Sequence, residues 1–151
     1  MTLDMIKARD PYALALLGSA VVTGAAFLPW FHVGDVGLPG IPDPAGYFVA
    51  AMGLTGVGLS VVGLRRGRDT RQGLVLAGLA ALTTLAVAWQ VGPATIASRA
   101  QARAEAVALV DNLTLEPVPP VGVSAGLFGG MVGAAAVAAA GLTGLRRRTG
   151  P

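Results

Sequence analysis

The stretch VGVSAGLFGGMVGAAAVAAAGLTGL, residues 121–145, decides the predicted fold. Small residues recur at every fourth position, which places them on one face of a helix. This small-residue ridge consists of Gly122, Gly126, Gly130, Ala134 and Ala138. In water each interior glycine costs a helix about 1 kcal/mol relative to alanine, whereas in lipid it lets another helix approach closely. The run is therefore predicted to be a transmembrane helix packed against a neighbour.

The composition of the whole chain is typical of a membrane protein. Of its 151 residues, 54% are hydrophobic and 13% are charged, and the mean hydropathy is +0.67. Four runs reach the roughly 20 residues needed to cross the hydrocarbon core. They are residues 11–31, 44–64, 73–91 and 121–145. We expect an all-α membrane protein in which residues 1–151 form a single membrane domain with four transmembrane helices.

Two of the expected helices begin with the same dipeptide. Asp10-Pro11 and Asp43-Pro44 each offer a capping carboxylate followed by a residue suited to the first helical position. A cleaved signal peptide is the rival interpretation of the first run, with small residues at Thr23 and Ala25 near a cleavage site. The apolar residues continue past them to a full span, which favours a retained helix.

The basic residues predict the orientation. The N-terminal segment, the loop at residues 65–72 and the C-terminal segment hold two, four and three Lys or Arg residues, against none and two in the other connections. This bias predicts that both termini face the cytoplasm. We expect the protein in the inner (plasma) membrane as a multi-pass protein. Five aromatic residues are then expected in a belt at the outer interface: Trp30, Phe31, Tyr47, Phe48 and Trp89.

A second small-residue face is predicted in the second helix. It consists of Gly53, Gly56, Ser60 and Gly63, spaced three, four and three residues apart. We expect this face to pack against one row of the last helix and to leave the adjacent row free for a partner. Pairing within the chain, with another copy or with another protein all remain open.

The connection at residues 93–120 is the distinctive exposed feature of the sequence. Its alanine-rich part predicts an extracytoplasmic helix over residues 94–112, and the proline-rich end at 115–120 predicts an extended segment. Arg99, Arg103 and Glu105 are candidate contacts for an outer partner. The alternative is a solvated helix face without specific binding.

The residue content excludes several kinds of chemistry. The chain has no cysteine, and the four apolar runs contain no Asp, Glu, Lys, Arg or His, so coupled ion transport is not expected. We predict no enzyme activity and no cofactor or metal site. His32, followed by Asp35, is either a lone metal, haem or pigment ligand or an exposed polar residue, and the second interpretation is favoured.

The positive charges indicate membrane rather than nucleic-acid contacts. The net charge is +3, but the basic residues lie at helix ends and not in a mixed basic and aromatic patch. The arginine clusters at 65–71 and 146–148 are candidate contacts for anionic lipids at the cytoplasmic face. Their role as topology determinants also accounts for them.

Several features together resemble a group of known proteins. They are the LPW sequence at Leu28–Trp30, the arginine-rich hairpin, the outer loop ending in prolines, and the Gly/Ala-rich last run followed by Arg146–Arg148. Over nearly its full length the chain resembles the small, uncharacterised four-helix integral membrane proteins of high-GC actinobacteria. The resemblance implies a bacterial membrane source and no particular activity.

Two functions from different classes remain in view. The first is a non-catalytic accessory or scaffold subunit of a larger membrane complex, respiratory or cell-envelope, acting through its small-residue faces and outer helix. The alternative is a protein that binds lipids or envelope precursors. A membrane enzyme using His32, Asp35 and Asp43 ranks third. The identity and stoichiometry of any partner are not encoded in a recognisable motif.

Overall fold

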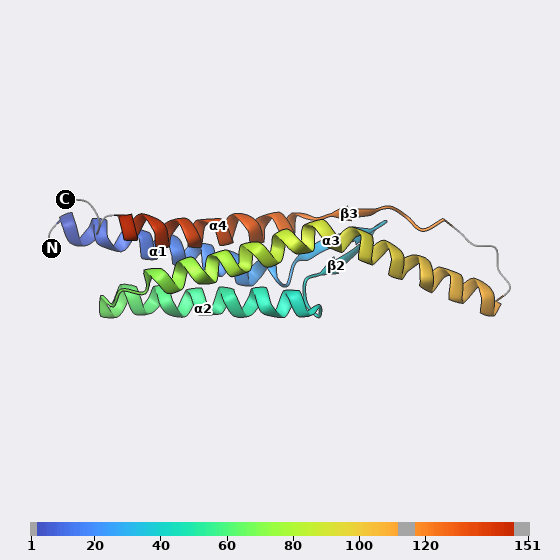
Figure 1. Ribbon diagram of the computed structural model, residues 1–151, viewed down its shortest axis with the longest axis horizontal. Coiled ribbons are helices and arrows are strands. Elements are labelled where there is room, and N and C mark those ends of the chain that lie inside the picture. Colours follow the sequence, from blue (N-terminus) through green and yellow to red (C-terminus); the bar gives the residue numbers. More distant parts are fainter. Residues whose placement is uncertain (1–2, 112–116, 147–151) are drawn as a thin grey trace.

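The computed structural model describes residues 3–111 and 117–146. These residues form four helices and a small sheet of three strands (Figure 1). In chain order the elements are α1 (Leu3–Ala25), β1 (Pro29–Val33), β2 (Val36–Pro39), α2 (Pro44–Arg66), α3 (Arg71–Asp111), β3 (Val121–Val123) and α4 (Ala125–Arg146). The fold is mostly helical, as predicted, but the sheet corrects the all-α assignment.

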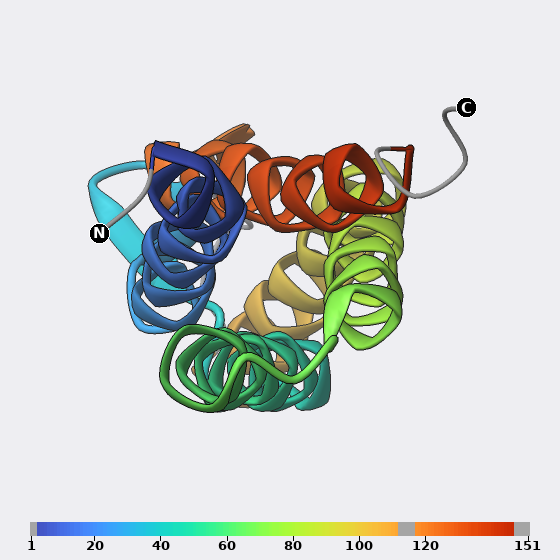
Figure 2. The ribbon, with the colours of Figure 1, turned by 90° about the vertical axis from the view of Figure 1, so that its left-hand side faces the viewer.

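The four helices form an up-and-down bundle. Figure 2 shows α1, α2, α3 and α4 in that order around the bundle, and each helix runs antiparallel to its two neighbours. The start of α1, the α2–α3 connection and the end of α4 lie at one end, here called the arginine end (Figure 1). The strands lie at the other, the sheet end. Among neighbouring pairs, α2 and α3 make the least extensive contact.

The first helix is shorter at its C-terminal end than the sequence predicted. The expected span was 11–31, but α1 ends at Ala25 and the chain then turns into β1. Helix ends leave carbonyl groups without partners, and the indole Nε1 of Trp30 donates to the carbonyl of Ala25 at 2.8 Å. The backbone N–H of Ile41 donates to the carbonyl of Ala26 at 3.0 Å. The hairpin thus closes the end of α1.

The placement of Trp30 and Phe31 corrects the predicted aromatic belt. Both side chains are buried where the sheet meets the helices, and Trp30 is only 2% exposed. Tyr47, Phe48 and Trp89 are exposed as the belt requires. The difference arises because the chain leaves the helical path after Ala25, which directs the two rings inward.

The sheet joins segments that lie far apart in the sequence. Its strand order is β2-β1-β3, and both pairs are antiparallel. Phe31 in β1 lies opposite Leu38 on one side and Val123 on the other. Because β3 uses the first residues of the run 121–145, α4 begins only at Ala125. Gly122 therefore belongs to a strand and not to the helical ridge.

One long helix replaces two predicted ones. The span expected at 73–91 and residues 94–111 of the outer helix expected at 94–112 are both parts of α3, which continues through Pro93; residue 112 lies outside the described residues. Proline forgoes one backbone hydrogen bond, but its φ angle suits a helix. With 41 residues, α3 is about 61 Å long, roughly twice the hydrocarbon thickness of a bilayer. Figure 1 shows it running past the sheet.

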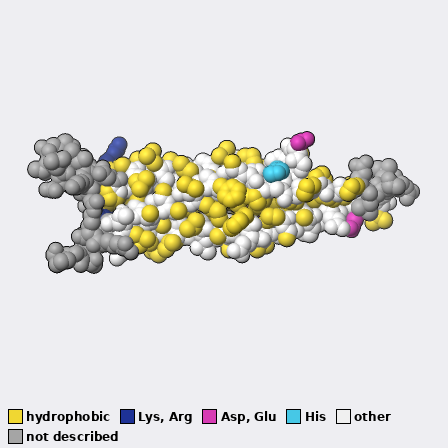
Figure 3. All heavy atoms as spheres, turned by 90° about the horizontal axis from the view of Figure 1, so that it is seen from above, with side chains coloured by type: hydrophobic (Ala, Val, Ile, Leu, Met, Phe, Trp, Pro, Cys, Tyr) yellow, Lys and Arg dark blue, Asp and Glu magenta, His cyan; other side chains and the backbone are white. Residues whose placement is uncertain are grey.

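Three of the described helices are long and apolar enough to cross a membrane. The stretches are Pro44–Arg66, Arg71–Val110 and Ala125–Thr143, while the apolar part of α1, Pro11–Ala25, is shorter. On the face drawn in Figure 3, a basic side chain lies beside one end, acidic side chains lie in the half toward the other end, and hydrophobic side chains are spread over the surface between them. Length, composition and this charge distribution are compatible with a membrane protein.

Only one of the two Asp-Pro dipeptides that were predicted to start a helix does so. Asp43 caps α2 as predicted, because its Oδ1 accepts a hydrogen bond from the Ala45 N–H at 2.9 Å and Pro44 takes the first helical position. Gly67, with a φ of 61°, ends the same helix in the left-handed conformation. The other prediction was wrong: α1 begins at Leu3, so Pro11 lies inside the helix.

The small-residue face of α2 packs mainly against α1 and only marginally against α4, where a Cβ atom at Gly56 would lie 3.9 Å from Cγ1 of Val137. A Cβ atom at Gly53 would lie 2.8 Å from the backbone nitrogen of Thr23, and one at Gly63 would overlap the ring of Tyr12. Gly56 faces the side chain of Ser19. Ser60 is fully buried and donates to the carbonyl of Gly56 at 2.7 Å. The predicted pairing with the last helix fails because α2 and α4 lie diagonally across the bundle.

The ridge of α4 faces the chain's own elements. Gly126 lies against Leu28 in the turn after α1, and Gly130 lies against Leu85 of α3 and Ala25. Ala134 and Ala138 are buried against α3, where a Cβ atom at Gly78 would approach the Ala138 nitrogen to 2.6 Å.

The adjacent row of α4 also packs largely within the chain; it consists of Ala125, Gly129, Gly133, Val137 and Gly141. A Cβ atom at Gly133 would lie 2.9 Å from the carbonyl oxygen of Gly18 in α1, and one at Gly18 would lie 2.9 Å from the carbonyl oxygen of Gly133. Gly141 meets Val75 and the Arg71 carbonyl of α3 in the same way. The row expected to remain for a partner is therefore largely occupied.

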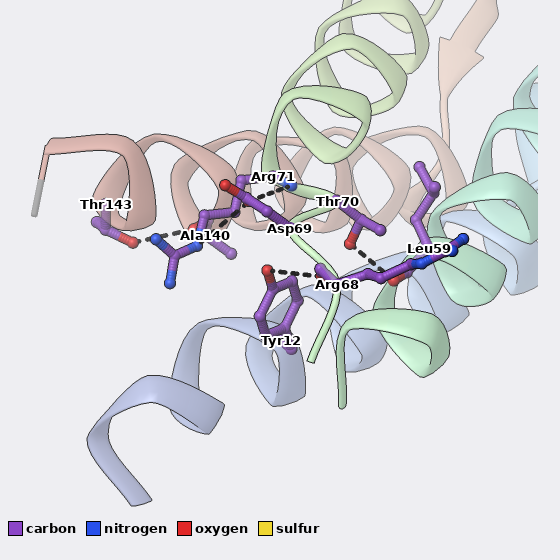
Figure 4. A network of polar contacts seen from close by, with 8 residues as sticks. All are labelled: Tyr12, Leu59, Arg68, Asp69, Thr70, Arg71, Ala140 and Thr143. Carbon is purple, nitrogen blue, oxygen red and sulfur yellow. Dashed lines mark hydrogen bonds and ion pairs between the residues drawn. The ribbon is translucent and has the colours of Figure 1, made fainter. Parts of the chain in front are cut away.

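Polar contacts hold the arginine end together (Figure 4). The Tyr12 hydroxyl donates to the carbonyl of Arg68 at 3.4 Å, and the Arg71 guanidinium lies 5.8 Å from the centre of the Tyr12 ring. Arg71 also pairs with Asp69 at 3.9 Å, and the Thr70 hydroxyl donates to the carbonyl of Leu59 at 2.9 Å. Arg71 is thus part of the packing. The other arginine side chains of this loop are exposed: Arg65, Arg66 and Arg68.

The contact between Gly18 and Gly133 predicts a position-specific effect of adding one methyl group. Gly133→Ala must push α1 away from α4, and overpacking of this kind costs about 1–3 kcal/mol. Gly129→Ala is the matched control, since nothing lies within 4 Å of its added Cβ. Thermal unfolding in mild detergent should show a lower midpoint for Gly133→Ala only. Equal midpoints for both variants would contradict the close helix contact.

Candidate functional site

A cavity of about 770 Å³ lies at the sheet end, between the start of α2 and the middle of α3. Helix α2 contributes only its first turn to the lining, whereas α3 contributes residues from Thr83 to Arg99. The cavity thus lies along the pair of neighbouring helices with the least extensive contact. Figure 1 shows α3 leaning away from α2 toward this end.

The hairpin supplies one apolar wall of the cavity. Trp30 and Phe31 from β1 and Leu38 from β2 line it. Two glycines let these rings lie close to backbone: a Cβ atom at Gly40 would lie 2.7 Å from Cζ2 of Trp30, and one at Gly92 would overlap the Phe31 ring. The buried aromatic rings therefore fix the shape of this wall.

The opposite wall is one face of α3. Its lining positions recur every three or four residues and include Thr84, Ala88, Val91, Thr95 and Arg99. The threonine hydroxyls donate to carbonyls four residues earlier in the same helix: Thr83 to Leu79 at 2.8 Å, Thr84 to Ala80 at 2.9 Å and Thr95 to Val91 at 2.9 Å. Their donor capacity is already used, so this wall offers mainly methyl groups to a ligand.

The lining contains two charged residues, Asp43 and Arg99. The carboxylate of Asp43 accepts a hydrogen bond from Ala45 at the N-terminus of α2, where the helix dipole also favours negative charge. Arg99 is exposed and makes no hydrogen bond or ion pair with any residue in the described ranges 3–111 and 117–146. The negative charge is therefore compensated locally, and the positive charge of Arg99 is not compensated by a described residue.

The structure separates the three candidate outer contacts. Arg99 lines the cavity, but Arg103 and Glu105 lie farther along α3 and do not. Glu105 accepts a hydrogen bond from the side-chain amide of Gln101 at 3.1 Å on the exposed surface. The small-residue positions are also absent from the cavity lining.

His32 has a structural surrounding of its own. Its Nδ1 lies 3.1 Å from the hydroxyl oxygen of Ser124, and its ring lies directly over Gly122 of β3. The backbone N–H of Ser124 donates to the carbonyl of Trp30 at 2.8 Å. Within the described part of the chain, no group of three or more His, Cys, Asp or Glu side chains is placed to hold a metal ion. These contacts attach β3 and the start of α4 to β1.

Sequence reasoning missed the cavity. The three- and four-residue spacing along α3 is visible in the sequence, but periodicity does not reveal which helix a face meets. The hairpin strands were not predicted, so the apolar wall that they form could not be predicted either. Its charge and its place in the exposed connection make Arg99 a candidate contact, but nothing in the sequence indicates that it lies beside an apolar cavity.

No protein-family model, no curated protein and no solved structure matches this chain. Its function is therefore inferred from the geometry of the site.

The stacking of His32 on Gly122 predicts a coupled mutational effect. Gly122→Ala should displace the imidazole and remove its contact with Ser124, a loss of about 1 kcal/mol for a hydrogen bond. The same substitution in a His32→Ala background should have little effect, because the obstructing ring is absent. Thermal unfolding of the four proteins forms a double-mutant cycle. Additive effects would show that the ring does not hold β3 in this way.

Proposed function

We propose that this chain is an integral protein of the bacterial inner membrane that binds a lipid or a lipid-linked envelope precursor. The observation that carries the proposal is the cavity itself. It is large enough for a small amphipathic ligand, since ligand sites commonly measure about 300–1,000 Å³. Its walls are mainly apolar, and its two charged residues are Asp43, at the start of α2, and Arg99, at the far end of the α3 wall.

The distribution of charge supports an orientation for this proposal. The arginine end contains the exposed side chains of Arg65, Arg66 and Arg68, together with the start of α1 and the end of α4. A cytoplasmic arginine end agrees with the positive-inside rule and allows contacts with anionic lipids of that leaflet. The sheet, the cavity and the outer part of α3 then face the outer leaflet and the extracytoplasmic side.

The depth of the cavity supports lipid as its ligand. At 1.5 Å of rise per residue, Thr83 lies about 18 Å and Arg99 about 42 Å along α3 from Arg71. With Arg71 near the cytoplasmic edge, a hydrocarbon layer of about 30 Å ends between these two positions. The cavity therefore extends from the depth of acyl chains to the depth of headgroups.

A bulky side chain in the cavity should displace the ligand. Val87 lines the cavity and is 56% exposed, so Val87→Trp fills space without entering the packed core. Val132→Trp is the matched control on α4, at a position that is 70% exposed and outside the lining. Native mass spectrometry of the detergent-purified protein should detect bound lipid on the wild type and on the control. For Val87→Trp, the affinity for lipid should fall by at least about tenfold. Equal lipid retention by all three would contradict the proposed site.

A second candidate function, the accessory or scaffold subunit, is favoured by the outer end of α3. Near that end Val107, Leu109 and Val110 are 50%, 81% and 83% exposed. Exposed apolar side chains grouped on a surface often mark a protein contact. The packing of α4 gives this candidate less support than expected, because its small-residue rows largely face the chain's own helices.

The scaffold candidate makes a separate prediction. Purification from the native membrane in mild detergent should recover partner proteins in fixed stoichiometry. Leu109→Asp should release them, because a charged group would then enter an apolar interface at a cost of several kcal/mol. Ala97→Asp, at an exposed position on a different face of α3, places the same charge on the helix and serves as the control. Quantitative proteomics measures the result, and recovery of the protein alone would reject this candidate.

A further inference from the structure

We infer that the ligand of the cavity is a lipid with an anionic, phosphate-bearing headgroup, and that Arg99 binds the phosphate. Its acyl chain lies along the α3 wall toward the membrane interior, beside Val91 and Val87. This inference rests on the proposed lipid-binding function and specifies the ligand class.

The charges of the lining favour an anion. Asp43 already accepts a hydrogen bond at the N-terminus of α2, where the helix dipole further compensates its charge. Arg99 has no such partner among the described residues. The uncompensated charge at the outer end of the cavity is therefore positive, and an anionic headgroup complements it.

Arginine suits a phosphate better than other charged groups do. Its planar guanidinium donates two parallel hydrogen bonds to phosphate oxygens, in a geometry that lysine does not reproduce. The long apolar stem of Arg99 can lie along the α3 wall while the charged group stays at headgroup depth. The position of this side chain, about 42 Å from the start of α3, agrees with such a contact.

The lining of the cavity favours a lipid over a free phosphate ion as the ligand. Thr83, Thr84 and Thr95 have used their hydroxyl protons within α3, so they add no donors for a small anion. The remaining lining is dominated by aliphatic and aromatic side chains, which an inorganic ion would leave uncovered. An acyl chain fills this space and removes the apolar surface from water.

The cavity is open to the side between α2 and α3, which gives the acyl chain of a lipid a route into it from the bilayer. Val87 and Val91 line the cavity and yet remain 56% and 55% exposed. Helix α2 contributes only Pro44 and Ala45, in its first turn, to the lining. A lipid of the outer leaflet can thus move sideways between α2 and α3 without leaving the membrane.

The test uses the full-length protein in nanodiscs that contain equal amounts of phosphatidylglycerol and phosphatidylethanolamine. After extraction, native mass spectrometry identifies the lipid retained by the protein. The wild type should enrich phosphatidylglycerol about tenfold, which corresponds to about 1.4 kcal/mol. Arg99→Gln should abolish this preference while still retaining lipid. Arg103→Gln, one turn farther along the same helix and outside the cavity, should keep it.

Each other outcome has a definite meaning. Lipid retained by the wild type without preference, or with the preference unchanged in Arg99→Gln, overturns the anionic-headgroup inference and leaves the lipid site standing. Enrichment of phosphatidylethanolamine also overturns it, and indicates a zwitterionic headgroup between Arg99 and Asp43. Displacement of the lipid by millimolar glycerol phosphate would identify a free phosphate compound as the ligand. Lipid retention that Val87→Trp does not reduce would instead reject the proposed function.

Discussion

The hydrogen bond from the indole of Trp30 to the carbonyl of Ala25 is the interaction on which the rest of the architecture depends. A helix end inside a bundle must find partners for its last carbonyl groups. Here the partner comes from the first strand, so the chain turns back under α1 instead of leaving the bundle. The buried ring then supports the sheet, and Trp30, Phe31 and Leu38 of the sheet form one wall of the cavity between α2 and α3.

Close helix contacts make the opposite side of the bundle dense. Gly18 and Gly133 bring the backbones of α1 and α4 together, and Gly78 does the same for α3 and α4. At these contacts α4 lies too close to α1 and α3 to leave a cavity between the helices. The bundle is therefore asymmetric, tightly packed around α4 and open between α2 and α3, which is why its cavity lies at that seam.

The charged residues have different roles at the two ends of the molecule. At the arginine end, Arg71 takes part in packing through Tyr12 and Asp69, while its neighbours point outward. At the sheet end, Asp43 completes a helix and Arg99 lies beside an apolar cavity without a described partner. An uncompensated cation beside apolar walls is the arrangement that an anionic amphiphile complements, and it motivates the lipid-binding proposal over catalysis.

Composition and local pattern by themselves determined the helical character of the chain, the positions of the apolar runs and the cap at Asp43, because each depends on neighbouring residues. They placed α2 within two residues at its C-terminal end. Only the tertiary structure decided that Trp30 turns inward, that residues 121–123 pair with a strand about 90 positions earlier, and that Gly53 meets α1. Periodicity identifies a face but not the surface it meets, so the sequence marked Arg99 as exposed and charged, and the fold placed it beside a cavity.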